Sequence, residues 1–528
     1  MDKRAYMIFL VAMLFLTVVV LGACAQVALP PHATPVTVVP QRDWSDAILY
    51  FVLIDRYADG DQGSNSRVDR LNPGAYHGGD LLGLARQLDE IAALGVTAIW
   101  INPVVKQIDS PVWAQGPPGS GWEGGFEHWA FHGYWAEDFE RIEPHFGSEA
   151  QLKALVEAAR ARGLKVLLDV VYNHPGYGAR YLTDPATRHW LRESQPDCAT
   201  DSLTCQVGGL PDFRTELPEV REYLFRAHLG LAQRIGVDGF RLDTVKHVEH
   251  DFWRAHRARS RAELGTSFFL LGEVWGGSYE VLEPWFSGDE LDAGFDFTFR
   301  GSCQGYVEGK GRTIAYAAYL KKRHQVRAGY HLAHYLSSHD EPMFLHELGN
   351  DIQKFKLCAA LQMTSLGIPV IYYGEEVARK GGAWPTNRGD MPWGDRAIAP
   401  GNGVARDEKL REYYRQLIAL RRAHPALSRG AFRELATDGD LLVFAREDQA
   451  SNDSVIVAVN RGEAQATATV PPPSRWTEEA VREALSGAPA EIDDGRLVIK
   501  TPPRTAQVYV VERRITGAIP WPTFASSM

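Results

Sequence analysis

The sequence predicts a (β/α)8 barrel (TIM barrel) followed by a small C-terminal β-sandwich domain. Three observations lead to this fold class. The chain has 528 residues, which is long enough for a barrel and a second domain. Eight short apolar runs alternate with helical patterns over most of its length. After residue 423 the helical patterns stop, and short strand-like runs separated by turns follow.

The predicted elements follow one another in a regular order. The eight barrel strands are expected at 48–54, 96–101, 165–171, 239–242, 267–271, 294–297, 335–337 and 369–373. Helical periodicity is clearest over 81–94, 150–162, 220–235 and 352–366. Two connections are unusually long, a Gly-, Trp- and Pro-rich loop at 103–137 and a polar insertion at 175–211. We expect the catalytic barrel over 43–430 and the C-terminal domain over 431–513, with strands at 441–445, 454–459, 466–470, 497–500 and 506–511, before a tail at 514–528.

The N-terminus indicates export. Lys3 and Arg4 precede an apolar run over residues 7–21, which is typical of a signal peptide. The run closes in Leu-Gly-Ala-Cys, ending at Cys24, which resembles the bacterial lipobox whose cysteine is lipidated. We therefore expect a lipoprotein signal peptide over 1–24, a lipid anchor at Cys24, a Pro- and Thr-rich tether over 25–42 and a cell-envelope location on the periplasmic or extracellular face. An uncleaved transmembrane anchor is the alternative.

Composition excludes some classes of partner. The chain carries 56 Lys and Arg against 66 Asp and Glu, a formal net charge of −10. Nucleic acid is therefore a poor partner, and membrane contact is expected only through the N-terminal lipid. We expect a monomer. Cys198 and Cys205 share one polar loop and could form a local disulfide in an oxidising compartment, and no cysteine spacing suggests zinc.

Acidic residues stand at the ends of several predicted strands. Asp243 ends the fourth strand, Glu273 ends the fifth and Asp340 follows the seventh. In a barrel, catalytic groups come from the C-terminal ends of strands. Strand alternation places Arg241 on the same face as Asp243, where its charge would keep that carboxyl ionised. We interpret Asp169, at the end of the third strand, as structural, because a single Asp at a strand end is commonly a helix cap.

Two carboxyl groups in opposite protonation states are the minimum machinery for hydrolysing a glycosidic bond. Asp243 beside Arg241 suits an ionised nucleophile. Glu273 lies near Trp275, without an adjacent cation in the sequence, and suits the general acid. The sequence therefore predicts a glycoside hydrolase whose carboxyl groups lie about 5–5.5 Å apart, the spacing of a retaining pair.

Four segments, 169–174, 239–247, 272–275 and 337–340, resemble the signature motifs of the α-amylase family of retaining glycoside hydrolases. The likeness covers about residues 47–511. It implies Asp243 as nucleophile, Glu273 as acid/base and Asp340 as a transition-state stabiliser that binds sugar hydroxyls. It also implies that the subsite for the cleaved sugar is lined by His132, Tyr134, His174, Arg241 and His339, and that the leaving-group side is faced by Lys246 and His247.

The resemblance also implies bound calcium. One oxygen-rich loop looks like a calcium loop of cyclodextrin glycosyltransferases and their amylase relatives, with the expected ligands Asp59, Asp61, Ser64, Asn65, Gly78 and Asp80. Ser64 stands here where an Asn is more usual, and a solvated turn is the alternative. A second site would join the barrel to the insertion through Asn173, Asp212 and the backbone carbonyl of His247.

The expected activity is retaining, endo-type hydrolysis of α-1,4-glucosidic bonds in starch and maltooligosaccharides, which is α-amylase activity. The sequences at 210–213 and 244–247 favour it. The sequences at 272–275 and 338–340 favour instead a cyclomaltodextrinase- or neopullulanase-like hydrolase, or an α-glucan transglycosylase. A non-catalytic glucan-binding or transporter-partner lipoprotein is a remote alternative, because such chains lose the acidic set that this chain retains.

Overall fold

The computed structural model describes residues 44–193, 196–474, 476 and 481–511, which belong to one compact unit. The expected signal peptide, Cys24, the tether and the C-terminal tail lie outside the described residues. Within the described part of the chain, no helix combines the length and apolar character needed to cross a membrane.

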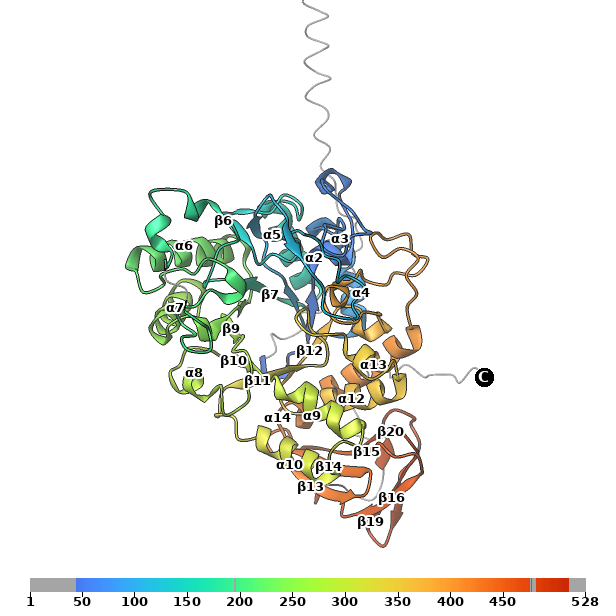
Figure 1. Cartoon of the computed structure of the whole chain (residues 1–528). Helices are drawn as coiled ribbons and strands as arrows, with labels where there is room; N and C mark the ends of the chain where they lie inside the picture. The colour runs from blue at the N-terminus through green and yellow to red at the C-terminus, as the bar shows by residue number, and fades with distance from the viewer. Residues whose placement is uncertain (1–43, 194–195, 475, 477–480, 512–528) are drawn as a thin grey trace, which may run out of the picture. The chain divides into compact units, whose positions relative to one another are not determined.

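Eight parallel strands close into a barrel in the order β1-β12-β11-β10-β9-β8-β7-β2 (Figure 1). They are β1 (Leu49–Val52), β2 (Ala98–Ile101), β7 (Lys165–Val170), β8 (Gly239–Leu242), β9 (Phe269–Gly272), β10 (Ala293–Phe295), β11 (His331–Tyr335) and β12 (Ile368–Tyr372). Seven match their predicted runs closely, whereas the run at 335–337 overlaps β11 only at its last residue. Polar His331 and His334 break the apolar pattern of β11, although His334 is buried and bonds the carbonyl oxygen of Gln362 at 3.0 Å.

Helices surround the barrel, and their ends follow local sequence signals. The predicted helix over 81–94 is broken at Gln87 into α3 and α4. Ser148 and Gln151 form a reciprocal cap at the start of α5, and α6 ends at Gly236, whose φ of 77° suits glycine. The helices are α2 (Ile54–Tyr57), α3 (Leu81–Arg86), α4 (Leu88–Leu94), α5 (Glu149–Ala161), α6 (Pro218–Ile235), α7 (His250–Leu264), α8 (Glu283–Ser287), α9 (Thr298–Val307), α10 (Thr313–Arg323), α11 (Phe344–Glu347), α12 (Ile352–Thr364), α13 (Glu408–Ala423) and α14 (Pro425–Arg429).

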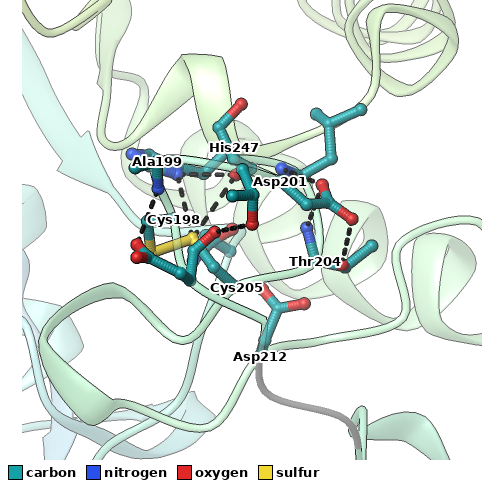
Figure 2. The surroundings of a disulfide bond; sticks show 12 residues. Cys198, Ala199, Asp201, Thr204, Cys205, Asp212 and His247 are labelled. Carbon is teal, nitrogen blue, oxygen red and sulfur yellow. Dashed lines mark hydrogen bonds between the residues drawn. A yellow bond between two sulfur atoms is a disulfide. The ribbon is translucent and has the colours of Figure 1, made fainter.

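The two long connections form substructures of their own. After β2, β3 (Val105–Gln107) pairs with β6 (Ala136–Ile142), and β4 (Val112–Ala114) pairs with β5 (Phe126–His128). The insertion after β7 contains the short 3-10 helices η3 (Arg180–Leu182), η4 (Arg188–Trp190) and η5 (Val207–Gly209). A disulfide joins Cys198 to Cys205 within it, with Cα atoms 5.0 Å apart (Figure 2).

The C-terminal region forms two antiparallel sheets, ordered β13-β14-β15-β20-β17 and β16-β19-β18. Their strands are β13 (Ala431–Asp438), β14 (Leu441–Asp448), β15 (Asp453–Asn460), β16 (Ala466–Val470), β17 (Val481–Glu483), β18 (Glu491–Asp493), β19 (Arg496–Thr501) and β20 (Thr505–Val511). Side chains of both sheets, including Leu441, Ile456, Leu497 and Ile499, share one apolar cluster, as in a sandwich. The sequence did not predict β13, β17 or β18, which are half-exposed or only three residues long.

Polar contacts attach the first sheet to the barrel helices. Arg446 of β14 is buried, and it donates to the carbonyl oxygen of Thr364 at 2.6 Å and to that of Gly430 at 2.8 Å. The Tyr306 hydroxyl of α9 donates to the carbonyl oxygen of Val459 at 2.9 Å. The sheets therefore support the helices that lie behind β10, β11 and β12.

Candidate active site

The parallel register of the barrel places the catalytic candidates. The amide of Asp243 donates to the carbonyl oxygen of Val170 at 3.0 Å, and that of Glu273 donates to Leu242 at 2.8 Å. Both residues thus continue the inter-strand hydrogen bonding one position beyond β8 and β9. Their side chains are held at the C-terminal rim by rigid backbone, as catalytic groups of a barrel are.

Arg241 on β8 joins the acidic groups. Its Nη1 lies 2.7 Å from Oδ1 of Asp243, its Nη2 lies 2.6 Å from Oε1 of Glu273, and Nη1 also lies 3.0 Å from Oδ1 of Asp169. The guanidinium is buried, and these carboxyl groups outweigh the effect of burial and raise its pKa. One guanidinium therefore brings Asp243 and Glu273 close together, as a retaining pair requires.

Glu273 has the environment of a general acid. Burial raises its pKa to about 8, because the neighbouring charges of Asp243 and Asp340 add to burial and outweigh Arg241. The backbone amide of Thr244 donates to its Oε2 at 3.0 Å and fixes the carboxyl in place. Glu273 is therefore protonated at neutral pH, as the sequence interpretation required.

Asp340 lies on the opposite side of the site, in the loop after β11. Nε2 of His339 lies 3.2 Å from its Oδ2, and Nη2 of Arg388 lies 3.1 Å from its Oδ1. Arg388 also donates to the carbonyl oxygen of His339 at 2.8 Å. Arg388 was missed in the sequence because it lies 48 residues after Asp340, in the loop after β12.

Three histidines offer ring nitrogens to a ligand. Nε2 of His132, Nε2 of His174 and Nδ1 of His339 are buried and have no hydrogen-bond partner among the described residues. Burial lowers the pKa of all three, to about 3 for His339, so the rings are neutral. Tyr134 stacks on His339 with ring centroids 5.3 Å apart. The structure thus brings the predicted subsite residues together as neutral hydrogen-bonding groups beside an aromatic face.

Asp169 is part of the site rather than a helix cap. It accepts hydrogen bonds from the Tyr134 hydroxyl at 2.8 Å and from Nε1 of Trp100 at 3.0 Å, and it pairs with Arg241. The structure therefore corrects the sequence interpretation that left it without a functional role. Asp169 and Arg241 are direct partners in the β7–β8 register, a relation that a strand alignment could have shown.

An apolar pocket lies beside Glu273. Its walls include Trp275, Phe297, Tyr335 and Asp340. The Trp275 side chain is 47% exposed and lies 5.0 Å from Phe297 between ring centroids. Exposed rings of this kind can stack against the apolar face of a sugar.

The predicted leaving-group residues follow Asp243 on a 3-10 turn, η6 (Val245–His247). Nδ1 of His247 lies 2.7 Å from the carbonyl oxygen of Ser202 and 3.9 Å from Sγ of Cys205 (Figure 2). Lys246 is half-buried on the same turn. The disulfide loop of the insertion is therefore held against the segment that carries Asp243.

The loop of the first expected calcium site uses several of its oxygens internally. Asp80 caps α3 and accepts from Gly83, and Asp61 accepts from Gly63. Asp59 contacts Arg70 at 3.1 Å, but that Arg side chain is 40% exposed and displaceable. Oδ1 of Asn65 is buried without a partner among the described residues. The loop thus retains an oxygen suited to a cation.

At the second expected site, three oxygens converge. Oδ1 of Asn173 lies 2.9 Å from the carbonyl oxygen of His247 and 3.2 Å from Oδ1 of Asp212. Such oxygens are satisfied by a cation between them, or by an amide turned so that its nitrogen donates to both. Across the described residues no three His, Cys, Asp or Glu side chains are grouped as metal ligands, so each site depends on amide or backbone oxygens.

Comparisons with known proteins agree with this geometry. A family model described as the α-amylase catalytic domain matches residues 51–196 and 188–398. The chain is 28% identical to a cyclomaltodextrinase of Geobacillus thermopakistaniensis, over 89% of this chain and 78% of that protein. It is 30% identical to neopullulanase 2 of Thermoactinomyces vulgaris, over 87% of this chain and 77% of that protein.

Solved structures show the same relationship. An Anoxybacillus α-amylase is 32% identical, with a TM-score of 0.77 over 89% of this chain and 98% of that one. An α-amylase of Geobacillus thermoleovorans, solved with acarbose, is 29% identical, with a TM-score of 0.76 over 90% of this chain and all of that one. The family model covers more than half of the chain, and the site carries the acidic residues expected of the family. This protein belongs to the α-amylase family of glycoside hydrolases.

Proposed function

We propose that this chain hydrolyses α-1,4-glucosidic bonds with retention of the anomeric configuration. The observation that carries the proposal is the contact of one buried guanidinium, Arg241, with both Asp243 and Glu273. It holds the two carboxyl groups near each other while burial keeps Glu273 protonated.

The residues divide the reaction as follows. Protonated Glu273 gives its proton to the glycosidic oxygen while a carboxylate oxygen of Asp243 bonds to the anomeric carbon, and the bond to the leaving sugar breaks. Ionised Glu273 then takes a proton from water, whose oxygen displaces Asp243. The ring nitrogens of His132, His174 and His339 are available to the sugar hydroxyls.

Short or cyclic maltooligosaccharides are the substrates that we propose. The first relatives by sequence are named cyclomaltodextrinases and neopullulanase. The exposed ring of Trp275 beside Glu273 offers a stacking surface for such ligands. The comparisons thus favour the cyclomaltodextrinase-like alternative over the endo-acting α-amylase expected from the sequence. Endo-hydrolysis of starch is the second candidate, favoured by the two similar α-amylase structures.

Asp243→Asn should lower kcat on the order of 10⁴-fold or more, because an amide is not a competent nucleophile. Glu273→Gln should also lose turnover of natural glucans. It should still form a glycosyl-enzyme with a substrate whose leaving group is activated, since departure then needs little protonation. Mass spectrometry of trapped protein and NMR of the first product measure both. Initial release of the β-anomer would refute the nucleophile assignment.

The basic limb of the kcat/KM profile should lie near pH 8. Glu273 must be protonated to act, so activity falls as pH rises through its pKa of about 8. Asp340→Asn removes a negative charge that raises this pKa, and it should move the limb to lower pH. Asp448→Asn in β14 serves as the control and should leave the limb in place. A limb unchanged in Asp340→Asn would contradict the assigned electrostatics.

β-Cyclodextrin should be cleaved with a higher kcat/KM than starch. Trp275→Ala should lower kcat/KM for cyclodextrin roughly fivefold, the effect of losing about 1 kcal/mol of ring contact. Trp113→Ala, an exposed tryptophan outside the pocket, is the matched control. Product analysis on starch, pullulan and β-cyclodextrin decides the matter. Faster cleavage of starch would establish the second candidate instead.

We also propose that calcium stabilises the fold through the loop that contains Asp59 and through the Asn173 junction. An ion that binds only the folded state raises stability by mass action. Chelation should therefore lower the Tm by about 2 °C or more. Asp59→Ala should remove part of that response, whereas Asp448→Asn should not. A Tm unaffected by chelator, with no metal found by elemental analysis, would disprove both sites.

A further inference from the structure

Arg192 lies where the insertion meets the barrel. The segment after η4 pairs with residues 212–214, since Leu191 and Phe213 form an antiparallel bridge. The amide of Arg192 donates to the carbonyl oxygen of Asp212 at 2.9 Å, and the amide of Phe213 donates to that of Asn173 at 2.9 Å. This backbone pairing fixes the Arg192 side chain beside Asp212, one step from the end of β7.

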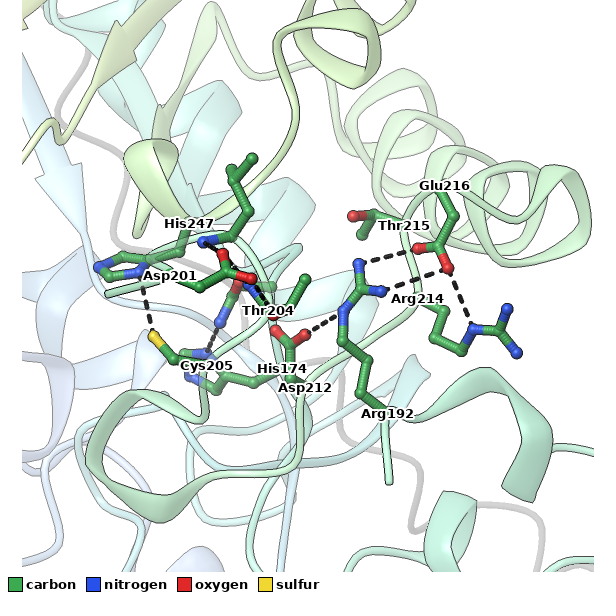
Figure 3. Close-up of polar contacts among 12 residues, drawn as sticks. His174, Arg192, Asp201, Thr204, Cys205, Asp212, Arg214, Thr215, Glu216 and His247 are labelled. Carbon is green, nitrogen blue, oxygen red and sulfur yellow. Dashed lines mark hydrogen bonds and ion pairs between the residues drawn. The ribbon is translucent and has the colours of Figure 1, made fainter. Parts of the chain in front are cut away.

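The Arg192 guanidinium contacts three carboxyl groups (Figure 3). Its Nε lies 2.6 Å from Oδ2 of Asp212, and its Nη2 lies 2.8 Å from Glu216 and 3.1 Å from Glu249. The side chain is only 13% exposed. Charge-assisted hydrogen bonds of this kind are the strong ones, and partial burial limits their screening. The guanidinium is therefore a fixed cation of the junction.

The three carboxyl groups come from both sides of the junction. Asp212 and Glu216 end the insertion, whereas Glu249 follows the η6 turn that carries His247 and precedes α7. Thr215 also donates to Glu249 at 2.5 Å. Asp212 therefore directs Oδ2 at Arg192 and Oδ1 at the oxygens of Asn173 and His247. A cation at either oxygen would join the insertion to the segment after β8.

We propose that Arg192 is a built-in cation that holds the insertion on the barrel whether or not calcium occupies the neighbouring oxygens. Arg192 is a positioning residue, because it acts through Asp212 on the segments that carry His174 and Asp243. The inference rests on the proposed calcium site only for the second cation. Without Arg192, the carboxyl groups of Asp212, Glu216 and Glu249 would depend on calcium for their nearest positive charge.

The experiment compares the full chain with Arg192→Gln by thermal unfolding, with calcium and with chelator. We expect chelation to lower the Tm of Arg192→Gln at least twice as far as that of the parent, and added calcium to restore most of the loss. Its kcat should rise with calcium concentration at nearly constant KM, while the parent kcat changes little. These readouts separate lost positioning from a general loss of fold.

Two variants serve as controls. Arg214→Gln removes a half-exposed partner of Glu216 and should respond to chelator as the parent does. Arg192→Lys keeps the charge without the planar fork and should fall between the parent and Arg192→Gln. Equal chelator shifts in the parent and in Arg192→Gln would overturn the proposal. So would a parent that loses all activity on chelation. Because the Tm is measured without substrate, failure of the proposed hydrolysis would leave this result interpretable.

Discussion

A single buried positive charge, the guanidinium of Arg241, organises the centre of this protein. An unpaired charge within a barrel would be strongly destabilising, so its carboxyl partners must be held with little freedom. β7 supplies Asp169, and the rims of β8 and β9 supply Asp243 and Glu273. The strands can hold all three because parallel register leaves almost no room for a side chain to move along the barrel axis. Catalytic geometry and barrel stability therefore depend on the same contacts.

Around this charge, the loops give each acidic group a different environment. Glu273 is buried and bonded by a backbone amide, so it is neutral. Asp340 faces a second arginine, Arg388, from the loop after β12. The loop after β2 contributes Tyr134, whose hydroxyl contacts Asp169 rather than solvent. The barrel thus supplies positions, and the loops supply the differences in charge that general acid catalysis needs.

Much of this arrangement could be predicted because strand ends are local features of sequence. An apolar run followed by a carboxyl residue identifies Asp243 and Glu273 without knowledge of the fold. Contacts between distant segments leave no such signal. Arg388 meets Asp340 across 48 residues, and Arg192 meets Glu249 across 57. Asp169 was interpreted as structural for the same reason, since its donors come from three other segments.

Elements were missed where tertiary contacts override local pattern. β11 contains His334, a polar residue whose buried ring is satisfied by Gln362, so the strand shows no continuous apolar run. The break at Gln87 divides a pattern that reads as one helix. In the C-terminal sheets, β13 is only half-buried and lacks clear alternation. Periodicity identifies elements that face one uniform environment, and these elements do not.

The attachment of the C-terminal sheets bears on how such a region can be exchanged in evolution. Arg446 reaches from β14 to the last carbonyl of α12, and Tyr306 reaches from α9 to β15. Arg461 likewise donates to the carbonyl oxygen of Tyr306 at 2.8 Å. A sheet transplanted from a relative would leave these groups without partners unless its own residues matched them. The barrel and its sheets must therefore be inherited together, as one unit of selection rather than as interchangeable modules.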